Sequence, residues 1–84
     1  MDLVFSQSAR KHKIAKGRAL EVIESTVAEE TTNEDGITEL YWKGNDSRGV
    51  ELEISGIIKP DRKTGEPIIL IIHVMPTDLR KERK

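Results

Sequence analysis

The longest apolar stretch of the chain runs from Ile68 to Val74 and is interrupted only by His73. Both faces of such a stretch are apolar, so the pattern predicts a strand near the centre of a sheet that is covered on both sides. Pro67 and Pro76 flank the stretch, and a proline cannot donate to a strand ladder. The strand is therefore expected to end just after a single titratable imidazole.

Two further strands are predicted upstream of this one. Residues 37–43 and residues 50–58 both alternate between apolar and polar side chains, which is typical of strands with one wet face. Residues 44–49 connect them and are rich in turn-forming residues, and residues 59–66 form a second, solvated hairpin loop. The segment 29–36 is acidic and polar, and it is expected to be a loop.

The N-terminal third of the chain is expected to be helical. Ser6 is a suitable N-cap for a short helix over about residues 7–13. Residues 3–5 form either a short edge strand or an apolar lead-in to that helix. A second helix over about residues 18–28 is predicted from apolar residues at three- and four-residue spacing. These residues are Ala19, Leu20, Ile23 and Val27.

These elements predict one α+β domain spanning residues 1–84. In this fold, two N-terminal helices pack on an antiparallel sheet of three to four strands. The helical part covers about residues 6–28 and the sheet about residues 37–75. A basic tail follows at residues 77–84 and either begins with a short helix or is frayed.

One face of the apolar strand has no predicted cover. Alternation places Ile69, Ile71 and His73 on one side of this strand and its other apolar residues on the opposite side. Two helices on one side of a sheet leave the other side open. The basic tail, a second copy of the chain in a homodimer, or another protein could cover Ile69 and Ile71, and we predict that a partner binds there.

Composition excludes several kinds of site. The chain has 84 residues and no cysteine, which rules out disulfides and thiolate metal ligands. Its two histidines lie at no metal-ligand spacing, so neither a metal nor another cofactor is expected. The first five residues lack the basic start of a signal peptide, and no apolar stretch approaches the roughly 18 residues of a membrane span. We therefore expect a cytoplasmic protein without a membrane partner.

Charge is abundant and unevenly distributed, although the net charge is only −1. Residues 1–20 carry five Lys or Arg against one Asp, and residues 77–84 carry four Lys or Arg against two acids. Residues 21–40 carry seven Asp or Glu and no Lys or Arg. If the two basic ends meet in the fold, they form a patch suited to binding phosphates; otherwise they are ordinary solvated surfaces.

Three short motifs resemble one family of small proteins. They are Ser8-Ala9-Arg10-Lys11-His12, the turn Gly44-Asn45-Asp46-Ser47-Arg48-Gly49 followed by Leu52-Glu53-Ile54, and Ile72-His73-Val74-Met75-Pro76. Together they resemble the BrnT-like toxins of actinobacteria, which have a RelE-like architecture. The resemblance implies a pair of helices on an antiparallel sheet, metal-independent cleavage of RNA, and a small antitoxin protein that covers the active face. The chain departs from this group at Lys16-Gly17-Arg18, where acidic residues are usual, and in lacking a strong net positive charge.

The same resemblance implies roles for particular residues. The matching positions are Arg10, Lys11, His12, Asp46, Arg48, His73 and Arg80. Cleavage of RNA without a metal needs a base, an acid and cations that bind phosphate. His73 and His12 suit the base and the acid because histidine titrates near neutral pH. Arg48 is expected to be the third catalytic residue at the reacting phosphate, and the remaining cations are expected to bind RNA phosphates: Arg10, Lys11 and Arg80.

Each of these residues also has a purely structural interpretation. His73 at a strand end can bond to the backbone, and His12 can pack beside Phe5. Arg48 can pair with Asp46 or Glu51. We predict a toxin that acts as a metal-independent ribonuclease and is inhibited by a cognate antitoxin. The alternative is a non-catalytic module that binds other proteins, whereas no helix-turn-helix signature supports a DNA-binding regulator.

Overall fold

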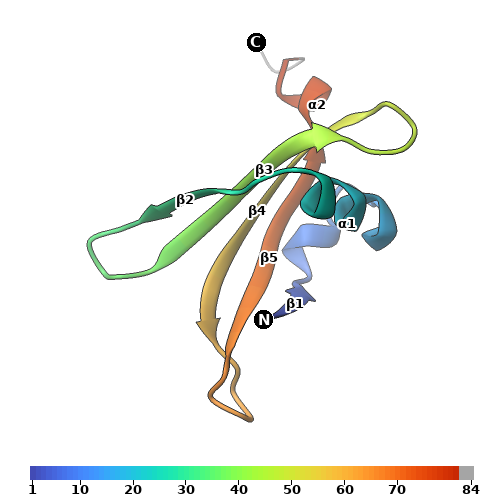
Figure 1. The fold of residues 1–84 in the computed structure, drawn as a ribbon. Helices are drawn as coiled ribbons and strands as arrows, with labels where there is room; N and C mark the ends of the chain where they lie inside the picture. The colour runs from blue at the N-terminus through green and yellow to red at the C-terminus, as the bar shows by residue number, and fades with distance from the viewer. Residues whose placement is uncertain (82–84) are drawn as a thin grey trace.

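The computed structural model of the protein describes residues 1–81, with side chains through Leu79. Five strands, one short 3-10 helix and two α-helices form in this part of the chain (Figure 1). In chain order they are β1 (Asp2–Phe5), η1 (Ser8–Arg10), α1 (Lys16–Ser25), β2 (Glu29–Thr32), β3 (Thr38–Asn45), β4 (Glu51–Pro60), β5 (Pro67–Pro76) and α2 (Thr77–Lys81). Neither described α-helix is long and apolar enough to cross a membrane.

The five strands form one sheet in the order β1-β5-β4-β3-β2. Strands β2 to β5 are antiparallel neighbours, whereas β1 runs parallel to β5. The predicted fold, with two N-terminal helices on an antiparallel sheet, is therefore wrong. The protein has a mixed sheet, and α1 is the one helix of more than five residues in the part that the structure describes.

The first predicted helix is reduced to the three residues of η1. Lys13 has a φ of 57°, a left-handed conformation that a right-handed helix cannot contain. The hydroxyl of Ser8 donates to the backbone oxygen of Ile72 at 2.9 Å. The backbone N–H of Ser6 donates to the oxygen of Ile71 at 3.0 Å. These bonds attach the segment to β5, and a helix this short has little stability of its own to oppose them.

The second predicted helix is confirmed as α1, but it ends at Ser25 rather than at residue 28. Thr26 has an extended backbone, and its hydroxyl donates to the carbonyl oxygen of Val22 at 2.6 Å. A threonine that bonds in this way competes with continuation of the helix. Val27 was expected on the apolar stripe of the helix, but it lies beyond the helix end and is 93% exposed.

The three predicted strands are confirmed as β3, β4 and β5, each with ends within two residues of the expected ones. The acidic segment after α1, however, is a strand in part. β2 pairs with β3 from Glu29 opposite Tyr41 to Thr32 opposite Thr38, and its four residues are all exposed. Because β2 lies at the edge of the sheet and buries neither face, apolar alternation gives no signal for it.

The core lies between α1 and one face of the sheet (Figure 1). Ala19 and Val22 are the buried residues of α1. The other buried apolar residues of the core are Ala9, Leu40, Trp42, Leu52, Ile54, Ile71 and Val74. Side chains alternate along a strand, so Tyr41, Glu53 and His73 point to the side of the sheet opposite α1. We call this side the far face.

A β-bulge decides which residues of β5 reach the far face. Ser55 pairs with His73, but the next residue, Gly56, pairs with Ile71, so Ile72 has no partner on β4. The bulge reverses the alternation beyond it, and Ile71 is consequently 0% exposed. The prediction that Ile71 shares an uncovered face with His73 is therefore wrong.

The residues that do share the far face with His73 beyond the bulge are Ile68 and Leu70. Ile69 packs half-buried against the core together with Ile71, so it is not on an uncovered face either. Gly56 makes this packing possible. A Cβ at its position would lie 3.0 Å from Cγ2 of Ile69 and 3.1 Å from Cδ1 of Ile71. The glycine thus gives both isoleucines room to pack against β4.

Candidate functional site

Three adjacent strands bring polar side chains together on the far face. Tyr41 of β3, Ser55 of β4 and His73 of β5 are cross-strand partners, so they lie in one row. Glu53 lies two residues before Ser55 on β4 and points to the same side. Its Oε1 lies 3.3 Å from Nε2 of His73, and its Oε2 accepts a hydrogen bond from the Tyr41 hydroxyl at 3.5 Å.

Glu53 places a carboxylate inside the fold. The residue is only 3% exposed, whereas the side chain of His73 is 34% exposed. A buried carboxylate is costly unless charged or hydrogen-bonding groups compensate for the lost water. His73 and Tyr41 supply two such groups. The arrangement holds one nitrogen of the imidazole against the carboxylate and leaves part of the ring open to solvent.

His12 reaches the same place from the N-terminal segment. The hydrogen bonds of that segment to β5 hold η1 beside the strand, and His12 follows η1 by two residues. The ring centroids of His12 and His73 are 6.3 Å apart, with an interplanar angle of 85°, so the rings meet edge to face. The structure therefore brings together the two histidines predicted as acid and base. With Glu53 and Tyr41 they are called the histidine cluster below.

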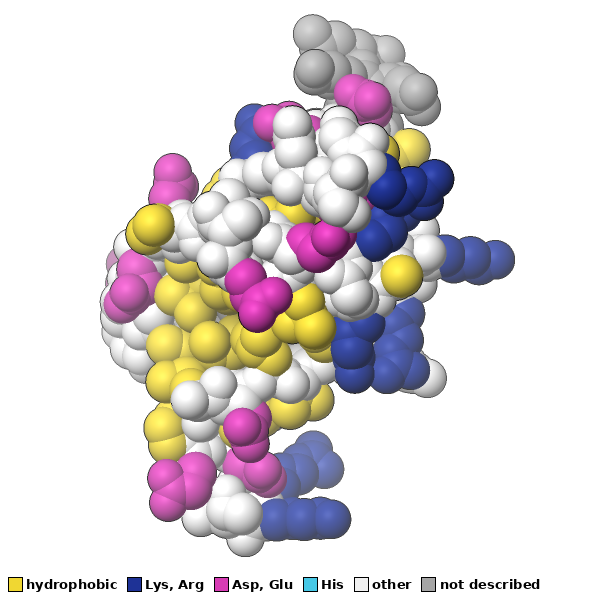
Figure 2. Space-filling model, turned by 45° about the vertical axis from the view of Figure 1, so that its right-hand side comes forward, with side chains coloured by type: hydrophobic (Ala, Val, Ile, Leu, Met, Phe, Trp, Pro, Cys, Tyr) yellow, Lys and Arg dark blue, Asp and Glu magenta, His cyan; other side chains and the backbone are white. Residues whose placement is uncertain are grey.

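His12 lies in a basic segment of the chain. The four bases nearest to it in the sequence are all exposed: Arg10, Lys11, Lys13 and Lys16. Residues 3–20 contain no Asp or Glu to balance them. Figure 2 shows that most of the visible Lys and Arg side chains gather along one flank of the molecule. A positive surface beside titratable groups favours an anionic ligand such as a phosphodiester.

Arg48, the third residue predicted to be catalytic, lies in the turn between β3 and β4. Its side chain is exposed, and its backbone N–H donates to Oδ1 of Asp46 at 2.9 Å. Among the side chains of residues 1–79, no hydrogen bond or ion pair joins that of Arg48 to His12 or His73. The structure thus unites His12 and His73 but does not join Arg48 to them.

Asp46 pairs with Arg18 rather than with Arg48. The Nε of Arg18 on α1 donates to Oδ2 of Asp46 at 2.6 Å, and Oδ1 accepts the backbone N–H groups of Arg48 and Val50. Burial alone would raise the pKa of Asp46, but the bonds from Arg18 and the backbone lower it below its ordinary value of 3.8. Asp46 is therefore a structural carboxylate that ties α1 to the turn.

Two further predictions concern Arg80 and metal binding. The side chain of Arg80 lies outside the described residues, so its contact with phosphate stays a prediction. Among the residues that the structure does describe, no three His, Asp or Glu side chains are grouped so that they could hold a metal ion.

Sequence reasoning finds both histidines but misses Glu53 and Tyr41. Alternation along residues 50–58 places Glu53 on a wet face, because nothing local shows what covers it. The register of the β4–β5 hairpin is the information that would have placed Glu53 beside His73. Once Ser55 is set opposite His73, Glu53 must lie on the same side and within reach of the imidazole.

Comparison with known proteins adds no information on function. No protein-family model matches this chain, and neither a curated protein nor a solved structure matches it. The histidine cluster and its surroundings are therefore the features of the molecule that bear on function.

Proposed function

We propose that the protein is a metal-independent endoribonuclease that acts as the toxin of a toxin–antitoxin pair. The observation that carries the proposal is the edge-to-face contact of His12 and His73, with Glu53 fixed against one nitrogen of His73. Two imidazoles side by side can serve as base and acid at one phosphodiester, because histidine titrates near neutral pH.

In this mechanism His73 is the base and Glu53 positions it. The Nε2–H of His73 donates to Glu53, which leaves Nδ1 free to accept the proton of a ribose 2′-hydroxyl. The 2′-oxygen then attacks phosphorus while the bond from phosphorus to the 5′-oxygen breaks. His12, as imidazolium, gives its proton to the departing 5′-oxygen. The products are a 2′,3′-cyclic phosphate and a 5′-hydroxyl end.

Cations near His12 supply the remaining requirement of the mechanism. Arg10 and Lys11 are exposed on the segment that carries His12, and the proposal assigns them to phosphates of the RNA. Negative charge grows on the phosphoryl oxygens in the transition state, so fixed positive charge beside the histidines lowers the barrier. The inhibitory partner is an antitoxin protein that covers the histidine cluster.

The direct test is cleavage of RNA by the purified protein in EDTA. We expect His73→Ala and His12→Ala each to lower the rate by about 100-fold or more, since either proton transfer is worth that much. Glu53→Gln keeps the volume of the side chain but loses its charge, and we expect a loss of about tenfold in kcat with little change in KM. Glu24→Gln, an exposed carboxylate on α1, is the matched control and is expected to behave as wild type.

The chemical ends of the RNA products identify the reaction, and melting curves of the variants show whether each one is folded. Wild-type products should carry 2′,3′-cyclic phosphates, and all variants should melt cooperatively, which separates lost chemistry from lost folding. Equal degradation by wild type and both histidine variants would identify a contaminating nuclease and reject the proposal.

A second candidate is a non-catalytic module that binds other proteins. The observation that favours it is the aliphatic surface on the far face, formed by Val4, Ile68 and Leu70. Expression of the chain alone in a bacterial host separates the two functions. Growth arrest that His73→Ala relieves supports a toxin, whereas normal growth with abundant folded protein supports the binding module.

A further inference from the structure

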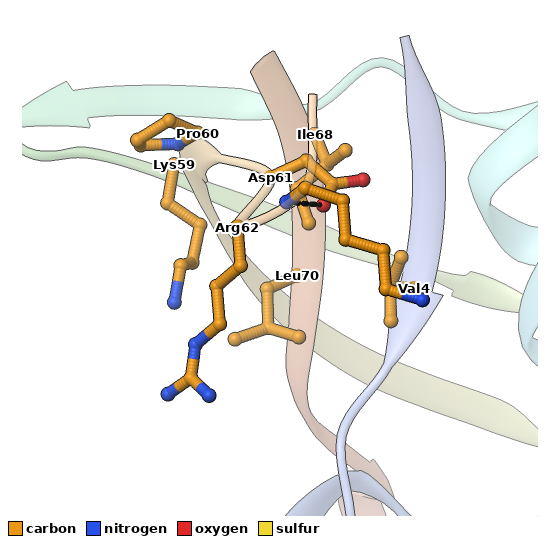
Figure 3. A pocket seen from close by; sticks show the side chains of 8 residues that line it. Val4, Lys59, Pro60, Asp61, Arg62, Ile68 and Leu70 are labelled. Atoms are coloured by element: carbon orange, nitrogen blue, oxygen red, sulfur yellow. Dashed lines mark hydrogen bonds between the residues drawn. The ribbon is translucent and has the colours of Figure 1, made fainter. Parts of the chain in front are cut away.

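A pocket of about 400 Å³ opens on the far face, where β1, β4 and β5 meet the loop between β4 and β5 (Figure 3). Its floor is aliphatic and consists of Val4, Ile68 and Leu70. Val4 and Leu70 are cross-strand partners and therefore lie side by side. Val4 is 43% exposed, so the floor is open to solvent.

Three cations border this floor. Lys59 lies at the end of β4, and Arg62 and Lys63 lie in the loop that follows. Figure 3 shows the side chains of Lys59 and Arg62 extending beside Leu70. The loop also contains Asp61, whose Oδ1 accepts the backbone N–H of Lys63 at 2.9 Å. Within the described chain, none of the three cations takes part in a salt bridge.

This combination of floor and border defines the kind of ligand that fits. No aromatic side chain lines the pocket, so it offers no surface on which nucleic-acid bases can stack. Aliphatic side chains can cover the floor, and neighbouring carboxylates can pair with the cations. The pocket therefore fits an acidic protein segment that exposes aliphatic residues.

The chain itself contains such a segment at residues 27–39, which we call the acidic hairpin. It includes β2, the turn after it and the start of β3, and it carries five Asp or Glu and no Lys or Arg. It also exposes two aliphatic side chains, Val27 and Ile37, the latter to 43%. Among the side chains that the structure describes, those of residues 1–79, no carboxylate of this segment forms a salt bridge.

The acidic hairpin and the pocket lie at the same end of the sheet. Glu39 of β3 pairs with Ile57 of β4, and Lys59 follows two residues later, so the turn before β3 and the loop after β4 leave the sheet at one end. Figure 1 shows the turn between β2 and β3 at the left and the loop between β4 and β5 at the bottom, both distant from α2 at the top. A two-fold axis between two copies can therefore set each hairpin against the pocket of the other copy and close the assembly.

We propose that the protein forms a two-fold dimer in which the acidic hairpin of each copy occupies the pocket of the other. The proposal goes beyond the ribonuclease activity and does not depend on it. Because each contact would join only one short hairpin to one pocket, we expect a dissociation constant on the order of 10 µM at low salt. Added salt should weaken the dimer, because the charges that border the pocket are accessible to ions.

Sedimentation of the full chain from about 1 µM to about 1 mM tests this association. We expect Arg62→Glu/Lys63→Glu to weaken the dimer at least about tenfold, since like charges then face each other. Arg10→Glu/Lys11→Glu changes the net charge equally but lies outside the pocket, and it should leave the association unchanged within about twofold. Arg62→Glu alone replaces the double variant if circular dichroism shows that the double variant does not fold.

A charge exchange identifies the second copy as the occupant. Glu34→Lys/Asp35→Lys should abolish self-association in the same way as the pocket variant. Mixing the two variants should restore dimers, because both hairpin–pocket contacts of the mixed dimer then join opposite charges. A wild-type chain that stays monomeric throughout, equal weakening by Arg10→Glu/Lys11→Glu, or a mixture that fails to associate would each overturn the proposal.

Discussion

Asp46 is the residue through which acid is expected to destabilise the fold. Burial opposes its ionisation, yet the bonds from Arg18 and from two backbone N–H groups lower its pKa below the ordinary 3.8. A carboxyl group with a lowered pKa stabilises the folded state fully above its unfolded pKa. It loses that contribution as the pH falls through its folded pKa, so this stability disappears on the acid side.

We predict that the free energy of unfolding of the wild type declines below about pH 4. Asp46→Asn should be less stable than wild type near neutral pH, because the amide cannot form the charged bond to Arg18. It should also lose stability less steeply with acid, since it has no proton to gain at this position. Urea unfolding across the acid range measures both effects. Parallel pH profiles for the two proteins would contradict the role assigned to Asp46.

For a single residue, the sequence identifies the chemistry of the side chain but not the groups that it contacts in the fold. His12 and His73 are recognised by type, and they do meet in the fold. Glu53 carries no sign of its burial in the surrounding residues, because the groups that compensate for it come from other strands. Asp46 lies two residues from Arg48 but pairs with Arg18 on a distant helix, so proximity in sequence suggests the wrong partner.

Among the elements, the end of α1 is held closely against β3. A Cβ on Gly44 would lie 2.6 Å from Cγ2 of Thr26, closer than non-bonded carbon atoms lie in folded proteins. Thr26 cannot rotate away without losing the bond from its hydroxyl to the carbonyl of Val22. The glycine therefore allows the helix and the strand to approach, and the threonine fixes where the helix ends.

We predict that Gly44→Ala lowers the free energy of unfolding by about 1–3 kcal/mol, the usual cost of overpacking. Thr26→Ser should recover most of this loss when combined with it, because serine keeps the hydroxyl and removes Cγ2. Gly17→Ala is the matched control: a Cβ there meets no atom within 4 Å, and alanine favours the helix. Independent, additive effects of the Gly44 and Thr26 substitutions in urea unfolding would refute the contact.

Elements with a regular apolar period are the ones that the sequence reveals. The alternation in β3 and β4, the apolar run of β5 and the stripe in α1 all come from faces that the fold buries. β2 buries neither face, so its acidic sequence shows no apolar alternation and predicts a loop. Bonds to β5, which is distant in sequence, limit η1 to three residues. The residues around η1 give no indication of these bonds.

For the molecule as a whole, the position of β1 depends on contacts that are distant in sequence. Four residues contain too little pattern to specify a partner, and β1 lies parallel to β5, 66 residues away in the register from Asp2 to Ile68. Antiparallel pairing follows from the short hairpins between β2 and β5, whereas a parallel pair needs a long connection. Here that connection contains α1 and the other strands, so the mixed sheet could not be inferred from adjacent elements.

The bulge has a similar effect across the molecule, because it reverses which residues of β5 face the core and which lie on the far face. Ile71 is completely buried and Leu70 lies in the open pocket, although uninterrupted alternation from His73 would exchange their places.

We predict that Ile71→Ala lowers the free energy of unfolding by about 2–5 kcal/mol, the range for a truncated core residue. Leu70→Ala should cost about 1 kcal/mol or less, as expected at a partly exposed site. Urea unfolding of the two variants under one condition makes the comparison. A larger loss for Leu70→Ala than for Ile71→Ala would mean that the strand pairs without the bulge, and it would remove both the aliphatic pocket and the dimer built on it.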